Sequence, residues 1–218
     1  MGKKGFFESV AEEGWLLPAS RKKLRQRRAL AGKASLLELS ETYRRVLYYF
    51  FDYPNTAIGL NDLAESVRAS KTSAREAVLL LEKHGYVKKE VIGNAWRLTA
   101  NAPNEFYFTI HKIPYNLQLV YESAILGTIY EKVPGFNAII LFGSYRWGTN
   151  NETSDVDIAV EVSGGKELHI TTLGTMAIGN RRNVKINLHI FSRNRIDINL
   201  FTNIANGIVL DGLLEVKP

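Results

Sequence analysis

Apolar residues recur at helical spacing in two segments of the first half of the chain. Over residues 41–53 and 70–84, polar residues fill the positions between the apolar ones, so each segment has one apolar face. This period of about 3.6 residues predicts two amphipathic helices. Asn61 is positioned to cap a short helix over residues 61–67, because its side chain can accept a hydrogen bond from a free backbone N–H group.

Two short runs that are typical of strands follow, at residues 86–92 and 95–99. Gly93-Asn94 separates them, and such a dipeptide between two strand patterns indicates a tight β-hairpin. The pattern over residues 41–100 therefore predicts three helices and then a hairpin.

The second half of the chain alternates between helical and strand patterns. Residues 101–115 contain Pro103 and Pro114 and are expected to form a linker. The elements expected after it are a helix over 116–132, a strand over 137–142, a short helix from Ser144, strands over 156–162 and 184–191, a helix over 196–205 and a last short strand or turn over 207–212. Between residues 163 and 183, Gly164-Gly165 predicts a turn and a loosely helical stretch follows it, up to the basic pair Arg181-Arg182.

A tight turn and two carboxylates lie close together in the run from residue 138 to residue 162. Gly143 allows the backbone to approach an anion closely, and Ser144 opens a helix whose free N–H groups favour negative charge. Asp155 and Asp157 point to the same face of a strand, because side chains alternate along it. Two adjacent carboxylates repel each other unless a cation lies between them, and their hard oxygens suit Mg²⁺.

The spacing of Gly143-Ser144, Gly148 and Ser154-Asp155-Val156-Asp157 resembles the nucleotidyltransferase superfamily, and its minimal, single-domain branch in particular. The resemblance covers roughly residues 116–218. It implies that Gly143, Ser144, Gly148 and Ser154 bind an NTP and that Asp155 and Asp157 bind Mg²⁺ (or Mn²⁺). Asp155, Asp157 and Ser144 are then candidate catalytic residues, in a reaction where the metal activates an acceptor hydroxyl and neutralises the leaving pyrophosphate.

The superfamily also uses a third carboxylate from a neighbouring strand, and this chain has none at the expected place. In the strand predicted over residues 184–191, the polar face carries Lys185, Asn187 and His189. Asn187 is the best match to the third position, and an amide can offer a neutral oxygen to a metal but cannot act as a base. His189 could accept a proton. Glu161 lies roughly 13 Å along the strand from Asp157.

The three helices and hairpin of residues 41–100 resemble a winged helix-turn-helix domain. In that family the third helix enters the major groove and the hairpin contacts the DNA backbone or minor groove. The resemblance implies contacts with double-stranded DNA from Ser70, Lys71, Thr72, Ser73, Arg75, Lys88, Lys89, Asn94 and Arg97. Domains of this kind also act as protein–protein modules, and that alternative stays open.

Charge is concentrated at the N-terminus. The chain has a formal net charge of +6, and residues 1–35 alone carry nine Lys/Arg against three Glu, which is also +6. The dense basic run in this arm could follow the phosphates of DNA, and its alternative is a solvated helix or tail. The residues concerned are Arg21, Lys22, Lys23, Arg25, Arg27 and Arg28.

The amino-acid composition narrows the class of protein further. An apolar content of 45% is enough for packed cores, and the absence of cysteine excludes disulfides and thiolate metal sites. No run of about 18 apolar residues and no signal-peptide pattern occurs, so a cytoplasmic protein that does not enter a membrane is expected.

Together these patterns predict an α/β protein (α+β overall) in which a mixed sheet of the nucleotidyltransferase fold is flanked by helices. The expected parts are a basic arm over 1–36, a winged helix-turn-helix over 37–100, a linker over 101–115 and a nucleotidyltransferase-like domain over 116–218. A homodimer is compatible with this organisation.

Three functions fit these parts. The first is a DNA-binding transcription regulator, similar to archaeal regulators of this kind, whose second domain binds Mg²⁺ and an NTP and has the parts to transfer a nucleotidyl group. The second is an active minimal nucleotidyltransferase of the antitoxin type, which modifies a partner protein and regulates its own operon. The third is a degenerate fold that serves as a sensor or an oligomerisation scaffold.

Overall fold

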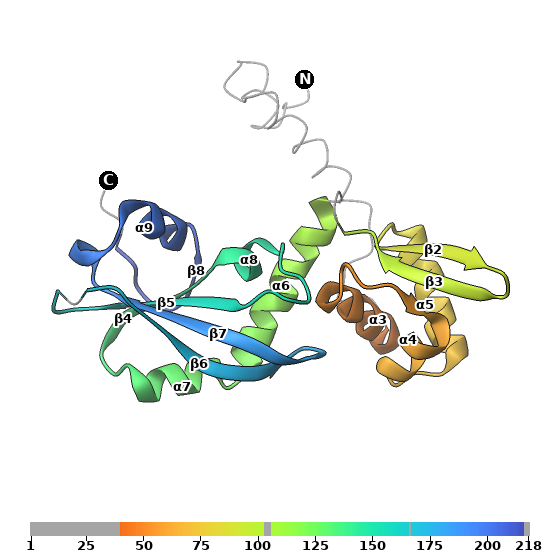
Figure 1. Cartoon of the computed structure of the whole chain (residues 1–218), viewed down its shortest axis with the longest axis horizontal. Coiled ribbons are helices and arrows are strands. Elements are labelled where there is room, and N and C mark those ends of the chain that lie inside the picture. Colours follow the sequence, from red (N-terminus) through yellow and green to blue (C-terminus); the bar gives the residue numbers. More distant parts are fainter. Residues whose placement is uncertain (1–39, 103–105, 166, 216–218) are drawn as a thin grey trace, which may run out of the picture. The chain divides into compact units, whose positions relative to one another are not determined.

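The computed structural model describes residues 40–102, 106–165 and 167–215 (Figure 1). The basic arm predicted to contact DNA lies outside these residues. Its members, Arg21, Lys22, Lys23, Arg25, Arg27 and Arg28, therefore stay a sequence-based prediction.

Residues 41–100 form the predicted three helices and hairpin. The elements are α3 (Glu41–Asp52), β1 (Ile58–Gly59), α4 (Leu60–Ser66), α5 (Lys71–Lys83), β2 (Val87–Ile92) and β3 (Ala95–Ala100). The two-residue strand β1 adds to the hairpin and gives a small antiparallel sheet in the order β1-β3-β2. Phe50, Leu63, Val78 and Leu98 are fully buried between the helices and this sheet, which explains why the apolar faces of the helices are needed.

Helices α4 and α5 differ in how their N-termini are capped. The side chain of Ser70 accepts a hydrogen bond from the backbone N–H of Ser73 at 3.1 Å, so Ser70 is the N-cap of α5, where the sequence pattern places the start of that helix. The prediction that Asn61 caps α4 is wrong, because α4 begins at Leu60 and its N-cap is Gly59, which has no side chain to make the bond.

The segment expected to be a linker is mostly helical. Helix α6 (Phe106–Glu122) begins well before Asn116 and runs through Pro114. Proline removes one backbone hydrogen bond from a helix, but the buried side chains of Phe108 and Tyr115 hold this one against its neighbours. The helix predicted over 116–132 is also divided, because α6 ends at Glu122 and α7 (Ile125–Lys132) begins after Ser123 and Ala124.

A five-stranded mixed sheet forms the centre of the second half, as predicted. Its order is β6-β7-β5-β4-β8, and β5 and β7 are the one parallel pair among its described neighbours. The strands and remaining helices are β4 (Phe136–Phe142), α8 (Gly143–Trp147), β5 (Val156–Val162), β6 (His169–Ile178), β7 (Arg181–Phe191), the 3₁₀ turn η2 (Arg193–Arg195), α9 (Ile198–Ala205) and β8 (Ile208–Gly212).

Helices cover both faces of this sheet. Alternate residues of the central strands, such as Ile139 and Ile158, pack with Ile125 and Ile129 of α7. Residues of the opposite parity, such as Ile140, pack with Ile204 of α9, and Figure 1 shows α7 and α9 on opposite sides of the strands. Because β4 and β5 are buried on both faces, they read in the sequence as continuous apolar runs.

The prediction of a loosely helical stretch between residues 163 and 183 is wrong, because this segment contains strand β6. The stretch expected to be loosely helical is an extended edge strand that pairs with β7 in antiparallel register, from His169↔Ile190 to Ile178↔Arg181. Its signal in the sequence is the dipeptide Gly179-Asn180, which forms the turn between the two strands, with Gly179 at a φ of 61°. Most of the side chains of β6 are solvent-exposed, so it has no strong apolar alternation.

None of the helices in the described part of the chain is both long enough and apolar enough to span a bilayer.

Candidate active site

The parallel pairing of β5 and β7 brings Asp157 and Asn187 together. The two residues are direct partners in the register of these strands. The amide nitrogen of Asn187 donates to Oδ1 of Asp157 at 3.0 Å and to Oδ2 of Asp155 at 3.2 Å. One amide group therefore bridges both carboxylates, from the strand next to the one that carries Asp157.

Gly143 lies directly against Asp157. Its φ is 69°, a left-handed conformation that glycine adopts without strain, and a Cβ atom built there would lie 2.7 Å from Oδ2 of Asp157. Any larger residue would push the carboxylate out of its place. The turn at the end of β4 and the acidic strand β5 thus meet at one point, as the sequence motif predicted.

Ser144 lies in the first turn of α8, beside Gly143. Phe142 occupies the N-cap and makes no side-chain cap, so no described side chain bonds the first N–H groups of this helix. The helix ends at Gly148, which has a φ of 68°. Gly148 lies so close to the backbone of α6 that a Cβ atom built on it would be 2.4 Å from the carbonyl oxygen of Thr109. Gly148 therefore has a packing role between α8 and α6.

Ser154 organises the turn that precedes the two aspartates. Its hydroxyl accepts a hydrogen bond from the backbone N–H of Asn151 at 2.9 Å and lies 3.1 Å from the side-chain oxygen of Asn151. Its carbonyl accepts a hydrogen bond from Arg181 at 2.8 Å, and the same guanidinium donates to the hydroxyl of Tyr145 at 2.9 Å. Arg181 thereby joins the start of β7, helix α8 and the residue next to Asp155.

Two buried polar residues of α6 support the same loop, and no pattern in the sequence predicts either of them. The ammonium group of Lys112 donates to the carbonyl of Asn150, and burial lowers the pKa of Lys112 to about 8. Asn116 donates through its amide to the side chain of Asn150 and to the carbonyl of Tyr145, each at 2.8 Å. The loop that follows α8 is therefore held from inside the protein.

Asp52, at the end of α3, and Asn55 and Thr56, which follow it, also form hydrogen bonds with residues of the second half of the chain. Asp52 is 3% exposed and accepts hydrogen bonds from the hydroxyl of Tyr115 and from the backbone and amide nitrogens of Asn180, at 2.7–2.8 Å. Burial raises the pKa of Asp52, while these hydrogen bonds lower it. Asn55 and Thr56 donate to the carboxylate of Glu152, at distances between 2.7 and 3.1 Å.

His189 is the one further titratable group near the aspartates on β7. Its Nε2 atom lies 3.9 Å from Oδ1 of Asp157, and its ring makes a T-shaped contact with the ring of Phe142. Burial lowers the pKa of His189 more than the neighbouring Asp157 raises it, so the ring is neutral at pH 7. Its Nδ1 atom is buried and has no hydrogen-bond partner among the described residues.

Two further acids of this domain, Glu161 and Asp197, have different roles. Glu161 is buried at the far end of β5 and its carboxylate pairs with Arg193 at 2.8 Å. Asp197 is the N-cap of α9 and accepts hydrogen bonds from the backbone of Asn199 and Leu200. Within the described residues, no group of three or more His, Asp or Glu side chains is arranged to hold a metal ion.

The oxygen-bearing side chains at this point nevertheless suit a hard divalent cation. Two carboxylates flank a space closed on one side by the Gly143 backbone, and a rotation of the Asn187 side chain by about 180° would present its oxygen in place of its nitrogen. In the structure the Asn187 amide nitrogen supplies the partial positive charge that the carboxylates require. The set would be two carboxylates and one neutral oxygen, with phosphate oxygens or water completing the shell.

The residues predicted to contact DNA lie on α5 and the hairpin. Ser70, Lys71, Thr72 and Arg75 are at the start of α5, and all four are exposed or lie at the surface. On the hairpin, Lys88, Asn94 and Arg97 are exposed, and Lys89 is half-buried. Arg75 from α5 and Lys89 from β2 lie over the ring of Trp96, at 5.2 and 4.9 Å from its centre.

Several of these residues already have partners in the protein. Ser73 bonds the N-cap Ser70 through both its backbone and its hydroxyl group. Lys89 pairs with Glu82 at 2.8 Å and Arg97 pairs with Glu90 at 3.0 Å. Lys71, Thr72 and Lys88 have no such partner among the described residues, which leaves them available to a ligand.

Comparison with protein families matches residues 123–200 to the model described as "Nucleotidyltransferase domain". The matched segment contains α7, the Gly143-Ser144 turn, both aspartates and Asn187, and it supports a nucleotidyltransferase fold for this part of the chain. Comparison with curated proteins finds no match.

Proposed function

We propose that the nucleotidyltransferase domain binds an NTP together with Mg²⁺ or Mn²⁺ at Asp155, Asp157 and Asn187. The observation that carries the proposal is the double hydrogen bond of the Asn187 amide to the two carboxylates, because it places three oxygen-bearing side chains around one point beside the Gly143 turn. The match of residues 123–200 to a nucleotidyltransferase domain is consistent with this use.

The residues of the site would have different roles in nucleotidyl transfer. Asp155 and Asp157 would hold the cation, which when bound polarises the phosphates and neutralises the charge of the leaving pyrophosphate. Ser144 and the N–H groups at the start of α8 would bind phosphate oxygens, and Gly143 would let them approach. Asn187 cannot remove a proton from an acceptor, so the neutral ring of His189 is the nearest described group on β7 that could do so.

Incubation with Mg²⁺, labelled ATP, CTP, GTP or UTP and candidate acceptors, including double-stranded DNA and partner proteins, tests the transfer step. We expect incorporation of label that is lost in the Asp155→Asn/Asp157→Asn variant. Incorporation that survives the double substitution would assign the activity to another site.

We also propose that residues 37–100 are a winged helix-turn-helix that binds double-stranded DNA through α5 and the β2–β3 hairpin, with 116–218 as the second domain. The observation in favour is that Lys71, Thr72 and Lys88 are exposed without partners on these two elements, while Arg75 and Lys89 flank Trp96 and join α5 to the hairpin. In winged helix-turn-helix domains the hairpin contacts the DNA backbone or minor groove.

Titration of labelled duplex DNA at increasing salt tests this second proposal. Affinity should fall with a slope of about −0.9 per phosphate contact in a plot of log K against log salt. The Lys71→Gln/Lys88→Gln variant should bind more weakly and show a shallower slope than a Lys132→Gln/Arg195→Gln control with the same loss of charge. An affinity that does not respond to salt would reject DNA binding.

A further inference from the structure

A cleft of about 650 Å³ lies away from the two aspartates and is lined by four arginines. Arg45 and Arg68 come from α3 and the residues after α4, and Arg181 and Arg182 come from the start of β7. We call this cavity the arginine cleft. Glu122 is the one acidic residue that lines it, so the lining carries a clear excess of positive charge.

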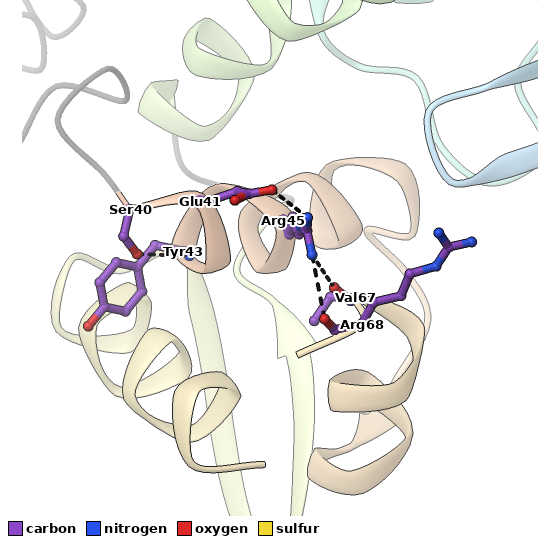
Figure 2. Close-up of polar contacts among 6 residues, drawn as sticks. All are labelled: Ser40, Glu41, Tyr43, Arg45, Val67 and Arg68. Atoms are coloured by element: carbon purple, nitrogen blue, oxygen red, sulfur yellow. Dashed lines mark hydrogen bonds and ion pairs between the residues drawn. The ribbon is translucent and has the colours of Figure 1, made fainter. Parts of the chain in front are cut away.

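Arg45 holds the backbone at one wall of the arginine cleft, and Figure 2 shows its polar contacts. Its guanidinium pairs with Glu41 and makes long hydrogen bonds to the carbonyl oxygens of Val67 at 3.4 Å and Arg68 at 3.5 Å. Arg68 has a φ of 52° and is the one non-glycine residue with a positive φ in the described part of the chain. Figure 2 shows its side chain extending away from Arg45. A strained backbone held in place by a neighbour is typical of functional positions.

The opposite wall combines a fixed and a free arginine in the same way. Arg181 is 8% exposed and is held by Tyr145 and Ser154, whereas Arg182 is exposed to solvent. Within the described residues neither Arg68 nor Arg182 has a hydrogen bond or ion pair through its guanidinium. Two unpaired guanidinium groups in a concave, positively charged site favour an anion with several oxygens, because each can bind phosphate in a bidentate manner.

Aromatic surface lies beside these charges. Tyr48 lines the arginine cleft, is half-buried and stacks on Tyr115 with ring centres 4.2 Å apart. An aromatic ring held rigid by a second ring is suited to stacking on a base. The size of the cleft is also in the range of small-molecule sites rather than of a macromolecular groove.

From these observations we propose that the arginine cleft binds a mononucleotide with two or more phosphates, without a metal ion, at a site separate from Asp155 and Asp157. The phosphates would contact Arg68 and Arg182, and the base would lie against Tyr48. Because Arg181 also donates to the carbonyl of Ser154, the cleft is linked through one side chain to the residue that precedes Asp155.

Binding of ATP to the full chain in EDTA, measured by calorimetry, tests the proposal independently of the metal site. We expect the Arg68→Gln/Arg182→Gln variant to bind ATP at least about tenfold more weakly than the unmodified protein. The Lys132→Gln/Arg195→Gln variant removes the same charge from exposed residues outside the cleft and should bind normally. The Asp155→Asn/Asp157→Asn variant should also bind normally, which separates this site from the proposed transfer site.

Tripolyphosphate is the second probe, because it carries the phosphate chain without the base. Weaker binding of tripolyphosphate than of ATP supports a nucleotide as the ligand, and equal affinity contradicts it. The proposal is overturned if metal-free ATP binding is unchanged in the Arg68→Gln/Arg182→Gln variant. It is also overturned if this variant loses affinity for duplex DNA alone, since the cleft would then belong to the DNA interface.

Discussion

Asn187 lies opposite Asp157 in the parallel pairing of β5 and β7, and its amide nitrogen is 3.0 Å from the Asp157 carboxylate. Its second hydrogen bond reaches Asp155, so one neutral side chain keeps two negative charges together. This arrangement explains how a site with two acids can be stable without a cation. If the proposed cation binds here, the metal-free and metal-bound states would use different atoms of the same amide.

Substitution of Asn187 by Asp should test this arrangement directly. Three carboxylates would then meet without a donor between them, so we expect Asn187→Asp to lower the free energy of unfolding by about 1–3 kcal/mol in EDTA. Mg²⁺ should restore much of that loss, because the ion binds the native site and not the unfolded chain. Denaturant unfolding with and without Mg²⁺ measures both effects.

The matched control is Asn183→Asp, which adds the same charge to an exposed position on the same strand. It should change stability by less than about 0.5 kcal/mol and should not respond to Mg²⁺. If the two variants behave alike, Asn187 does not separate the two carboxylates.

Substitution of Gly143 by any other residue should lower the stability of the protein and weaken NTP binding. Gly143→Ala places a Cβ atom 2.7 Å from the Asp157 carboxylate and forces a positive φ on alanine, so we expect a loss of at least about 1–2 kcal/mol in stability and weaker NTP binding. Gly127→Ala is the control, since Gly127 is an exposed residue of helix α7 with no atom within 4 Å of the added Cβ, and the change should stabilise the helix by up to about 1 kcal/mol. A Gly143→Ala protein with normal stability and NTP binding would show that the close approach has no importance.

Lys112 should make stability depend on pH in the alkaline range. Burial lowers its pKa to about 8 from 10.5, so between these values the unfolded chain holds more protons than the folded one. The free energy of unfolding should therefore rise with pH, by at most about 1.4 kcal/mol per pH unit. Tyr115 and Tyr145 have raised pKa values and oppose this trend above pH 10, so unfolding is measured from pH 8 to 10.

The Lys112→Met variant should lose this alkaline rise. A variant of an exposed lysine, Lys132→Met, should keep it. Should Lys112→Met and the unmodified protein show the same slope, the rise must come from another group.

Asp52 should be important for stability although it lies far from the aspartates in the sequence. In Asp52→Ala the hydroxyl of Tyr115 and the backbone N–H of Asn180 lose their acceptor, so we expect a loss of about 2–4 kcal/mol in thermal or denaturant unfolding. Glu65→Ala removes an exposed acid from α4 and should have little effect. Equal, small effects of both substitutions would show that the buried hydrogen bonds contribute no net stability.

The sequence was sufficient where one local signal decided the structure. An apolar run placed β5 at residues 156–162, the apolar faces placed α3 and α5, and Gly93-Asn94 placed the hairpin. Strand alternation placed Asn187 on the polar face of β7 together with Lys185 and His189, and the pairing register in the structure sets Asn187 opposite Asp157. These features depend on periods of two or 3.6 residues, which the chain displays directly.

The sequence was insufficient where contacts between distant segments decided the structure. Pro114 suggested a linker, but α6 continues through it because Phe108 and Tyr115 are buried. β6 has few buried side chains, and its extended form depends on pairing with β7. Lys112 shows no pattern that predicts its burial, because its partner Asn150 is brought to it by the fold of the loop after α8.

The central claim is that Asp155 and Asp157 hold a divalent cation together with an NTP. The most direct test measures ATP affinity in Mg²⁺ and in EDTA for the unmodified protein, for Asp155→Asn/Asp157→Asn, and for Glu131→Gln/Glu167→Gln, which removes two exposed acids elsewhere. We predict that Mg²⁺ tightens ATP binding at least about tenfold in the unmodified protein and in the control, and that the Asp155→Asn/Asp157→Asn variant shows no tightening. The same gain from Mg²⁺ in all three proteins would contradict the claim.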